Sequence, residues 1–219
     1  AHIVYCTPTK FGANIVTANC TATTFAVAVA VALFFGACRI IGTAAAAKLG
    51  AIASLINTNQ RNDALKHSFN LCKPKAIVVG EELFDAFNAV HKEIDSSESP
   101  IYYVHDTGAK KTPKKAIDLE DVTSTISSRN PLTTGSVTLQ DPCFYIYTSG
   151  TTGLPKASIM THFRWIKASA GFGFCALALK PGEVIYAALP LYHNNALTVA
   201  WSASSVGGAA MAIRRKFSA

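Results

Sequence analysis

The sequence predicts an α/β fold in which mostly parallel strands are flanked by helices. Three observations support this prediction: short strand-like apolar runs alternate with helical segments, half of the 219 residues are hydrophobic, and only 15% are charged. Such alternation is typical of parallel sheets because each pair of parallel strands needs a crossover connection. The composition excludes wholesale disorder, since the chain has enough apolar residues to build a core.

The most apolar stretch is Phe25–Cys38, FAVAVAVALFFGAC, which is followed by Arg39. Its alternating Ala and Val favour a buried strand, and the Ala-rich continuation TAAAAKLGAIASLI, Thr43–Ile56, favours a buried helix. With the preceding threonines, the stretch also approaches the ~17 to 25 residues that a membrane-spanning helix needs. A core strand is the favoured interpretation and a membrane segment is the alternative. No basic region precedes the stretch, so it does not resemble a cleaved signal peptide.

The next part of the chain predicts a helix, a strand and a second helix. Apolar residues recur at helical spacing over residues 61–72, and Pro74 stops this helix. The run AIVVG at Ala76–Gly80 has the composition of a short buried strand. The second helix is predicted over residues 81–90, where two glutamates favour its N-terminus.

A strand and a polar connection follow. IYYVH at residues 101–105 predicts another short strand. Residues 106–131 are rich in Lys, Thr and Ser, and only residues 117–126 have a weak helical pattern. We therefore expect residues 106–131 to form a flexible connection between two halves of the chain.

The second half begins with a strand at Cys143–Tyr147, which has aromatic and β-branched composition. A Gly-rich turn follows it, and ASIMTHFRWIKASAGFGF at residues 157–174 is compatible with a helix. Residues 182–205 predict a strand, a turn at Pro190–Asn195 and a helix, and residues 207–217 predict a Gly turn and one more strand.

The net charge of +7 and the pI near 9.1 favour anionic partners in general. The basic residues are scattered, with small clusters at 110–111, 114–115 and 214–216, and no regular set of aromatics is interleaved with them. This pattern favours a solvated basic surface, so we expect no nucleic-acid partner.

The six cysteines are widely spaced and form no CxxC pair. This spacing excludes zinc-finger and thioredoxin-like sites. In a chain of this length, we expect buried thiols in a reducing compartment rather than a disulfide framework.

The segment YIYTSGTTGLPKASIMTH, Tyr145–His162, has the components of a polyphosphate-binding loop, and we call residues 148–156 the phosphate loop. Its hydroxyl side chains can donate to phosphate oxygens, its glycines permit close backbone approach, and its lysine offsets negative charge. The spacing matches neither GxxxxGK[ST] nor GxGxxG. From composition alone, an ordinary Thr/Ser/Gly-rich turn is an equal alternative.

The contiguous run YTSGTTGLPK, Tyr147–Lys156, resembles the signature of the adenylate-forming superfamily, which includes acyl-CoA synthetases and luciferases. The resemblance implies that the loop holds the β- and γ-phosphates of ATP while a carboxylate attacks the α-phosphate. It also implies a magnesium ion, for which the hydroxyl of Thr151 is the one ligand that can be named. The residues that it assigns to nucleotide binding are Thr148, Ser149, Gly150, Thr151, Thr152, Gly153 and Lys156.

Other segments are similar to the fatty-acid transport protein and long- and very-long-chain acyl-CoA synthetase group. They are AAKLGAIASLINTNQRNDALKHSFNLCKPKAIVVG, LPLYHNNALTVAW and IRRKFSA, and the resemblance extends over about residues 46–219. We therefore expect three parts: a divergent apolar segment at 1–45, a first α/β part at 46–130, and a part with the phosphate loop at 131–219.

Two residues are candidates for the acyl end of the site. By sequence alone, His193 is more typical of a structural histidine, but the resemblance places Tyr192 and His193 beside the carboxylate and the acyl channel. His67 and His162 are interpreted as surface or packing histidines. Trp165 and Trp201 are interpreted as helix-core aromatics, with Trp201 alternatively lining an acyl tunnel.

The resemblance implies a fatty acid–CoA ligase that uses ATP, Mg²⁺ and CoA to convert a fatty acid into its acyl-adenylate and then its thioester. Later motifs of the superfamily are absent before Ala219. We therefore expect an N-terminal part of a longer enzyme that is inactive by itself. Two alternatives are a membrane-associated fatty-acid uptake protein and a non-catalytic nucleotide-binding fragment. The sequence leaves both a membrane-associated and a cytoplasmic location open, and it does not predict an oligomeric state.

Overall fold

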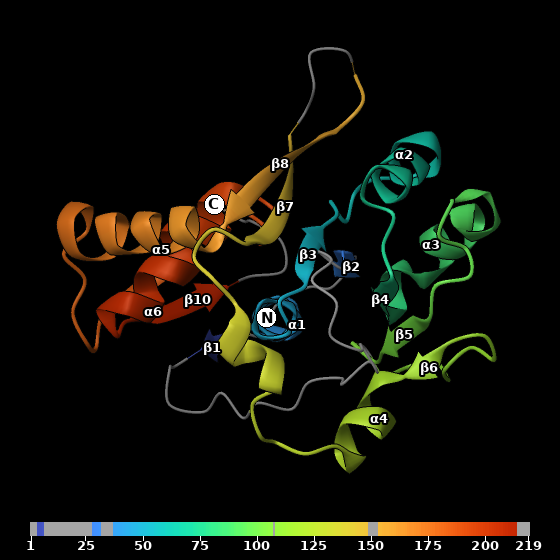
Figure 1. Cartoon of the computed structure of the whole chain (residues 1–219), viewed down its shortest axis with the longest axis horizontal. Helices are drawn as coiled ribbons and strands as arrows, with labels where there is room; N and C mark the ends of the chain where they lie inside the picture. The colour runs from blue at the N-terminus through green and yellow to red at the C-terminus, as the bar shows by residue number, and fades with distance from the viewer. Residues whose placement is uncertain (1–3, 7–27, 32–36, 107, 149–152, 214–219) are drawn as a thin grey trace.

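This computed structural model of the protein describes residues 4–6, 28–31, 37–106, 108–148 and 153–213. Two sheets lie side by side and helices surround them (Figure 1). The helices α2, α3 and α4 lie on the right of this view beside the large sheet, and α5 and α6 lie on the left with the small sheet. The predicted α/β class is therefore confirmed.

The large sheet has seven described strands in the order β6-β5-β4-β2-β3-β7-β8. All neighbours from β6 to β7 are parallel, and β8 is antiparallel to β7. The predicted parallel pairing is thus confirmed, with one hairpin added at the edge. The strands are β2 Ala28–Val31, β3 Ile52–Leu55, β4 Ala76–Gly80, β5 Ile101–Val104, β6 Ile117–Asp118, β7 Pro142–Thr148 and β8 Lys156–Thr161.

The helices of the first half connect and cover the strands of the large sheet. An α-helix lies between most successive parallel strands, as a parallel crossover requires. These helices are α1 Ala37–Lys48, α2 Asn62–Cys72, α3 Phe84–Val90 and α4 Leu119–Thr125, with the 3₁₀ turns η2 Glu81–Leu83, η3 His91–Glu93 and η4 Leu132–Ser136.

The small sheet has the strand order β1-β10-β9, and helical segments of the second half pack beside it. The strand β10 is parallel to β9 and antiparallel to β1. The elements are β1 Val4–Cys6, α5 His162–Ala170, η5 Gly171–Ala176, β9 Val184–Ala187, η6 Asn195–Ser202, α6 Ala203–Gly207 and β10 Ala210–Ile213, of which η5 and η6 are π-helical.

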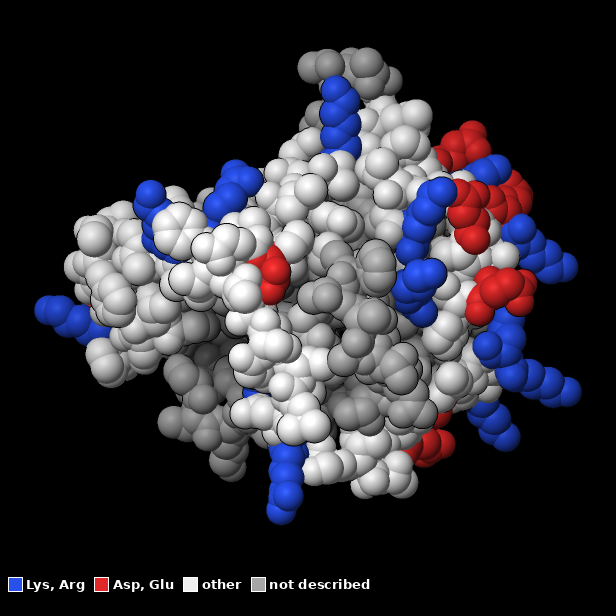
Figure 2. All heavy atoms as spheres, in the orientation of Figure 1, with Lys and Arg blue, Asp and Glu red and all other residues white. Residues whose placement is uncertain are grey.

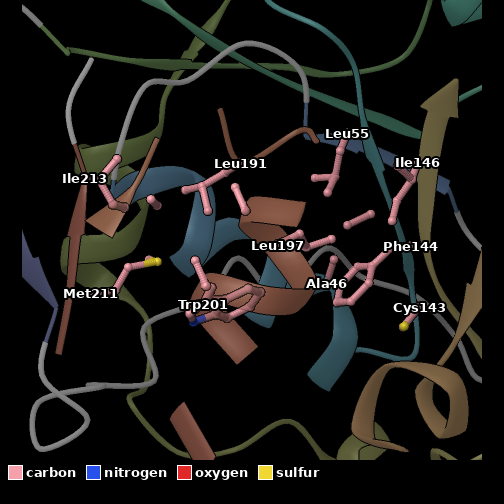
Figure 3. Close-up of a cluster of buried hydrophobic side chains, with 14 of the residues drawn as sticks. Ala46, Leu55, Cys143, Phe144, Ile146, Leu191, Leu197, Trp201, Met211 and Ile213 are labelled. Carbon is pink, nitrogen blue, oxygen red and sulfur yellow. The ribbon is translucent and has the colours of Figure 1, made fainter. Parts of the chain in front are cut away.

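A hydrophobic core joins the two sheets. Figure 3 shows Leu197 and Trp201 of η6 between Phe144 of the large sheet and Met211 of the small sheet. Each of these side chains is at most 7% exposed. Burial of this apolar surface, at about 25 cal/mol per Å², fixes the position of one sheet relative to the other.

A second core lies between α2, α3 and the strands β4 and β5. It is rich in aromatic rings: the centroids of Phe69 and Phe87 are 5.5 Å apart, and those of Phe84 and Tyr103 are 5.4 Å apart. Tilted and edge-to-face ring pairs of this kind stabilise a core beyond their buried area. They hold α2 against the sheet. This matters for the site because α2 contacts the phosphate-loop hairpin, which is formed by β7, the phosphate loop and β8.

The prediction of one helix over residues 43–56 is wrong after Lys48. Helix α1 ends there, and Gly50 adopts φ +72°, a left-handed conformation that ends helices. Ile52–Leu55 then forms the fully buried strand β3. A short apolar run in the middle of a parallel sheet has no polar face, so its composition alone does not distinguish strand from helix.

The prediction of a helix from residue 157 is also wrong in its first turn. Residues 156–161 form β8, and the helix α5 begins at His162, where the side chain of Thr161 accepts a hydrogen bond from the backbone N–H of Arg164. Pairing with β7 satisfies the backbone of this segment, and Thr161 is a favourable N-cap. The tertiary partner therefore decides the conformation of Lys156–Thr161.

The prediction of a flexible connection over residues 106–131 is wrong at residues 108–110, whereas its weak helical piece is confirmed by α4. The carboxylate of Glu81, which is 1% exposed, accepts backbone hydrogen bonds from Gly108, Ala109 and Lys110 at 2.7–3.0 Å. The weak helical pattern corresponds to β6 and α4. The connection is held because a buried carboxylate needs several donors, and these backbone groups supply them.

The strand interpretation of Phe25–Cys38 is confirmed for residues 28–31, which form β2 between β3 and β4. Residues 37–38 begin α1, and the remainder of the stretch lies outside the described residues. Within the part of the chain that the structure describes, none of the helices combines the length and apolar character needed to cross a bilayer.

Cys72, Cys143 and Cys175 are free thiols. Cys72 and Cys143 are buried, as expected, whereas Cys175 is exposed. The expectation of buried thiols is therefore wrong for Cys175, which follows the exposed Phe174 on η5.

Candidate functional site

The candidate site lies where neighbouring parallel strands end. Strands β3 and β7 are adjacent and parallel, so their carboxyl ends lie at the same end of the sheet. The segments that follow them are residues 56–60 and the phosphate loop. In open parallel sheets, ligands bind at the carboxyl ends of strands because the loops there converge.

The base of the phosphate loop is a pair of residues on the β7–β8 hairpin. Thr148 ends β7 and pairs with Lys156, which begins β8. The hydroxyl of Thr148 donates to the carbonyl oxygen of Lys156 at 3.4 Å. Gly153 has φ +86°, a conformation that side chains other than glycine rarely adopt. The other predicted residues, Ser149, Gly150, Thr151 and Thr152, lie outside the described residues.

Lys156 is exposed at the start of β8 and can reach an anionic ligand. Figure 2 shows a basic side chain at the tip of this hairpin, whereas most acidic side chains on this face lie on the right, over α2 and α3. No described acidic residue forms an ion pair with Lys156. The lysine is therefore available to a phosphate group.

Helix α2 is hydrogen-bonded to both strands of the hairpin through two consecutive residues. Nε2 of His67 lies 3.0 Å from the carbonyl oxygen of Pro155, which directly precedes β8. The phenol of Tyr147, next to the end of β7, donates to the carbonyl oxygen of Ser68 at 2.9 Å. The hairpin base is thus attached to α2 on either side of the loop.

A buried serine completes this attachment. Oγ of Ser54 on β3 lies 2.8 Å from Oη of Tyr147. Because the single phenolic hydrogen is donated to the carbonyl of Ser68, the hydroxyl of Ser54 is the donor to Tyr147. Burial raises the pKa of Tyr147 far above its usual value, and burial also raises the pKa of the neighbouring Cys72 thiol. Both side chains are therefore neutral at physiological pH.

Tyr192 and His193 lie in the predicted turn after β9. The turn is closed by a 2.8 Å hydrogen bond from the backbone N–H of His193 to the carbonyl of Pro190. Nδ2 of Asn59 donates to Oη of Tyr192 at 3.4 Å, so the segment after β3 contacts the turn after β9. The imidazole of His193 is exposed, and its Nδ1 accepts from the backbone N–H of Asn195 at 3.4 Å. The structure thereby brings Tyr192 beside Asn59, in the segment that follows β3, and β3 is the strand next to β7.

The aromatic residues singled out from the sequence lie in the core. The ring centroids of Trp165 and Trp201 are 5.1 Å apart, and those of Trp165 and Phe144 are 5.4 Å apart. Their interpretation as helix-core aromatics is confirmed. His162 is half-buried, burial lowers its pKa, and its packing environment agrees with the interpretation as a packing histidine.

The described residues do not supply a magnesium site. Among them, no group of three or more His, Cys, Asp or Glu side chains is placed to hold a metal ion. Thr151, the one ligand proposed from the sequence, lies outside the described residues. Magnesium prefers carboxylate, water and phosphate oxygens, so the described residues do not themselves identify its ligands.

Sequence reasoning missed three residues that support the site: Ser54, Asn59 and His67. Each acts through a contact with a residue at least 88 positions away in the sequence, so no local sequence pattern predicts it. The sequence favours a surface or packing role for His67. Only its position on α2 opposite Pro155 distinguishes it from the other histidines.

Comparison with protein families and curated proteins gives consistent results. A family model described as "AMP-binding enzyme" matches residues 24–219. The medium/long-chain-fatty-acid–CoA ligase FadD6 of Mycobacterium tuberculosis is 40% identical over 180 residues, which cover 82% of this chain and 28% of the relative. The long-chain fatty acid transport protein 6 of Mus musculus is 32% identical over 176 residues, which cover 79% of this chain and 27% of the relative. The chain spans less than a third of these relatives.

Solved structures share the fold. An anthranilate CoA ligase, AuaEII, in complex with anthranoyl-AMP superposes with a TM-score of 0.75 at 19% identity, covering 90% of this chain and 36% of the other. The N-terminal domain of FACL13 from Mycobacterium tuberculosis, with a bound inhibitor, superposes with a TM-score of 0.70 at 22% identity, covering 88% and 45%. At these identities, the structures establish the arrangement of sheets and helices alone.

Proposed function

The chain belongs to the AMP-binding enzyme family, and we propose that it carries the polyphosphate-binding part of a fatty acid–CoA ligase. The observation that carries this proposal is the Thr148–Lys156 pair at the base of a glycine-containing loop, at the carboxyl end of a parallel strand. The 40% identity to a curated medium/long-chain-fatty-acid–CoA ligase supports the substrate class.

In the proposed first step, a fatty carboxylate oxygen attacks the α-phosphorus of ATP. The new C(O)O–P bond forms as the bond to the pyrophosphate oxygen breaks, giving acyl-adenylate and pyrophosphate. Lys156 binds the β- and γ-phosphates with its ammonium group, which offsets the charge that the departing pyrophosphate gains. Thr148 donates to the same phosphates once its hydroxyl leaves the carbonyl oxygen of Lys156. Interactions that strengthen as charge develops lower the barrier.

In the proposed second step, the CoA thiolate attacks the acyl carbon and displaces AMP. We assign Tyr192 and His193 to the carboxylate and acyl end of the site, because their turn contacts the segment after β3 through Asn59. His193 has an exposed imidazole, which can donate to a carboxylate oxygen from Nε2 while Nδ1 accepts from Asn195.

We propose further that the 219-residue chain binds ATP but does not complete the ligation. It spans 28% of the length of the mycobacterial relative, so most residues of that ligase have no counterpart among the 219 residues. Titration of the chain with ATP and with pyrophosphate tests the binding. Lys156→Ala is expected to weaken both ligands about tenfold or more, because a charge-assisted contact is lost. Equal affinity of wild type and variant for pyrophosphate contradicts the assignment.

The ligation itself is tested in a hybrid enzyme. In the mycobacterial ligase, the 180-residue segment that matches this chain is replaced by this chain's own segment. Fatty-acid-dependent exchange of pyrophosphate into ATP is the expected result, with Lys156→Ala in the same hybrid as the control. A folded hybrid that binds ATP without catalysing exchange would contradict the ligase assignment and would favour a non-catalytic nucleotide-binding role.

A further inference from the structure

His67 contacts the phosphate-loop hairpin from outside the residues assigned to ATP. It lies on α2, and its Nε2 is 3.0 Å from the carbonyl oxygen of Pro155. A carbonyl oxygen only accepts hydrogen bonds, so Nε2 carries the hydrogen and donates it. We propose that His67 is a positioning residue that holds Lys156 in the orientation that binds polyphosphate. This inference rests on the proposed function.

The peptide group between Pro155 and Lys156 is the physical link. The proline ring fixes φ at residue 155, so the orientation of the following peptide plane depends on one torsion angle, ψ of Pro155. The hydrogen bond from His67 to the oxygen of that plane restrains this torsion. The direction in which the chain enters Lys156 is thereby restrained, and the lysine side chain starts from a defined position.

The opposite strand is restrained from the next residue of the same helix. Tyr147 donates to the carbonyl of Ser68, and Thr148 pairs with Lys156 across the hairpin. The two strands of the hairpin are therefore held by residues 67 and 68 together. Tyr147 and Ser54 hold β7 without His67, so loss of the imidazole is expected to release the Lys156 side while β7 stays in place.

Positioning of this kind changes affinity through preorganisation. A lysine whose backbone is already held in the binding position loses less conformational entropy when a ligand binds. Removal of the one neutral hydrogen bond that holds the Pro155–Lys156 peptide is expected to weaken polyphosphate binding by about tenfold, and the charged contact of Lys156 itself remains. The expected signature is weaker binding without loss of the fold.

The test compares three variants of the 219-residue chain by titration with pyrophosphate and with ATP. His67→Ala removes the donor, and His67→Gln keeps an N–H donor on a side chain of similar reach. Leu71→Ala is the matched control, because Leu71 lies on the same helix with its side chain 46% exposed. The expected result is about tenfold weaker pyrophosphate binding for His67→Ala, recovery in His67→Gln, and wild-type binding for Leu71→Ala.

A second measurement tests the hydrogen bond from His67 to Pro155 without a ligand. Trypsin cleaves after Lys156, which precedes Ala157, and after Arg129, which lies in an exposed segment after α4. Cleavage after Lys156, relative to cleavage after Arg129, is expected to become several times faster in His67→Ala, while the melting temperature stays near that of the wild type. His67→Gln is expected to restore protection.

The outcomes separate this inference from the proposed function. If wild-type chain binds pyrophosphate and His67→Ala binds it equally well, the positioning role is overturned while the proposed function stands. If His67→Ala weakens binding only in proportion to a lower melting temperature, and Gln does not restore it, the role is structural and the inference is overturned. If wild-type chain binds neither ligand, both proposals fail. The ratio of cleavage after Lys156 to cleavage after Arg129 then reports only whether the hydrogen bond from His67 to Pro155 exists.

Discussion

Tyr147 of β7 and Ser68 of α2 are joined by a 2.9 Å hydrogen bond from the phenol to the backbone carbonyl. The hydroxyl of Ser54 on β3 donates to the same phenol at 2.8 Å. Three elements that are distant in sequence therefore meet at one oxygen atom directly before the phosphate loop. This chain of hydrogen bonds connects the stability of the fold to the geometry of the candidate site.

The first prediction concerns this phenol. Tyr147→Phe removes both bonds and leaves the hydroxyl of Ser54, which is buried, without its partner. We expect the free energy of unfolding to fall by about 1–3 kcal/mol, measured by urea denaturation. In the double variant Tyr147→Phe, Ser54→Ala, the loss in the free energy of unfolding is expected to be smaller than the sum of the losses in the two single variants. The reason is that no buried hydroxyl is then left without its hydrogen-bond partner. Strict additivity would contradict the shared bond.

The second prediction concerns the packing of η5 against α6. A Cβ added at Gly173 would collide with Cγ2 of Val206 and would lie 3.0 Å from the carbonyl oxygen of Ala203. Gly173→Ala is expected to lower the free energy of unfolding by about 1–3 kcal/mol, because the two helical segments must separate.

The matched control is Gly171→Ala in the same π-helical segment, where an added Cβ would meet nothing within 4 Å. This variant is expected to be neutral or to stabilise the chain by up to about 1 kcal/mol, since alanine favours helices. Equal melting temperatures for the two variants would show that η5 does not pack on α6 in this way.

The third prediction concerns the carboxylate of Glu81. It accepts three backbone N–H groups from residues 108–110, so Glu81→Gln directs an NH₂ group at these donors. We expect a loss of about 2–3 kcal/mol in the free energy of unfolding and faster proteolysis after Lys110.

Asp85→Asn is the control for charge alone. Its carboxylate pairs with Lys110 at 3.0 Å but is 81% exposed, so its removal is expected to cost less than about 1 kcal/mol. A larger effect for Asp85→Asn than for Glu81→Gln would contradict the anchoring role of the buried carboxylate.

The fourth prediction is a pH dependence at the base of α4. His105, Asp118 and Thr112 meet with distances of 2.6–2.9 Å between their side-chain atoms. The hydrogen bonds from Thr112 and His105 lower the pKa of Asp118 to about 2, and the hydrogen bond with Asp118 raises the pKa of His105, to which the nearby Glu81 charge adds.

Asp118 and His105 stabilise the fold over different pH ranges. The contribution of Asp118 is present above about pH 4 and is lost as the pH falls toward 2. The contribution of His105 is present below its ordinary pKa near 6.5 and is lost as the pH rises through its raised value. The pair therefore stabilises the fold most between about pH 4 and 6.5.

His105→Gln tests this dependence. Urea midpoints at pH 5.5 and 8.5 are expected to differ less in this variant than in the wild type, because glutamine does not titrate. His193→Gln, which replaces an exposed histidine, is expected to keep the wild-type difference. If both variants show the wild-type difference, the His105–Asp118 pair does not control it.

The sequence predicts helices and strands well where their apolar pattern is unambiguous. The α2 helix, the strands β4 and β5 and the strand β10 lie where their patterns place them. The errors fall on Ile52–Leu55 and Lys156–Thr161, which are short runs compatible with either conformation. Strand partners in the sheet decide both segments, and partners are not visible in a local pattern.

The sequence by itself determined the contiguous part of the candidate site. A strand, a glycine-containing hydroxyl-rich loop and a lysine follow one another over residues 143–156, and the contiguous resemblance of Tyr147–Lys156 to the adenylate-forming signature, rather than composition alone, identifies them. Only the tertiary structure decided what supports that loop: Ser54, His67 and Asn59 reach it or its neighbouring turn across 88–133 residues. The physical reason is that packing of α2 on the sheet, driven by burial of Phe69 against Phe87, sets which polar groups meet.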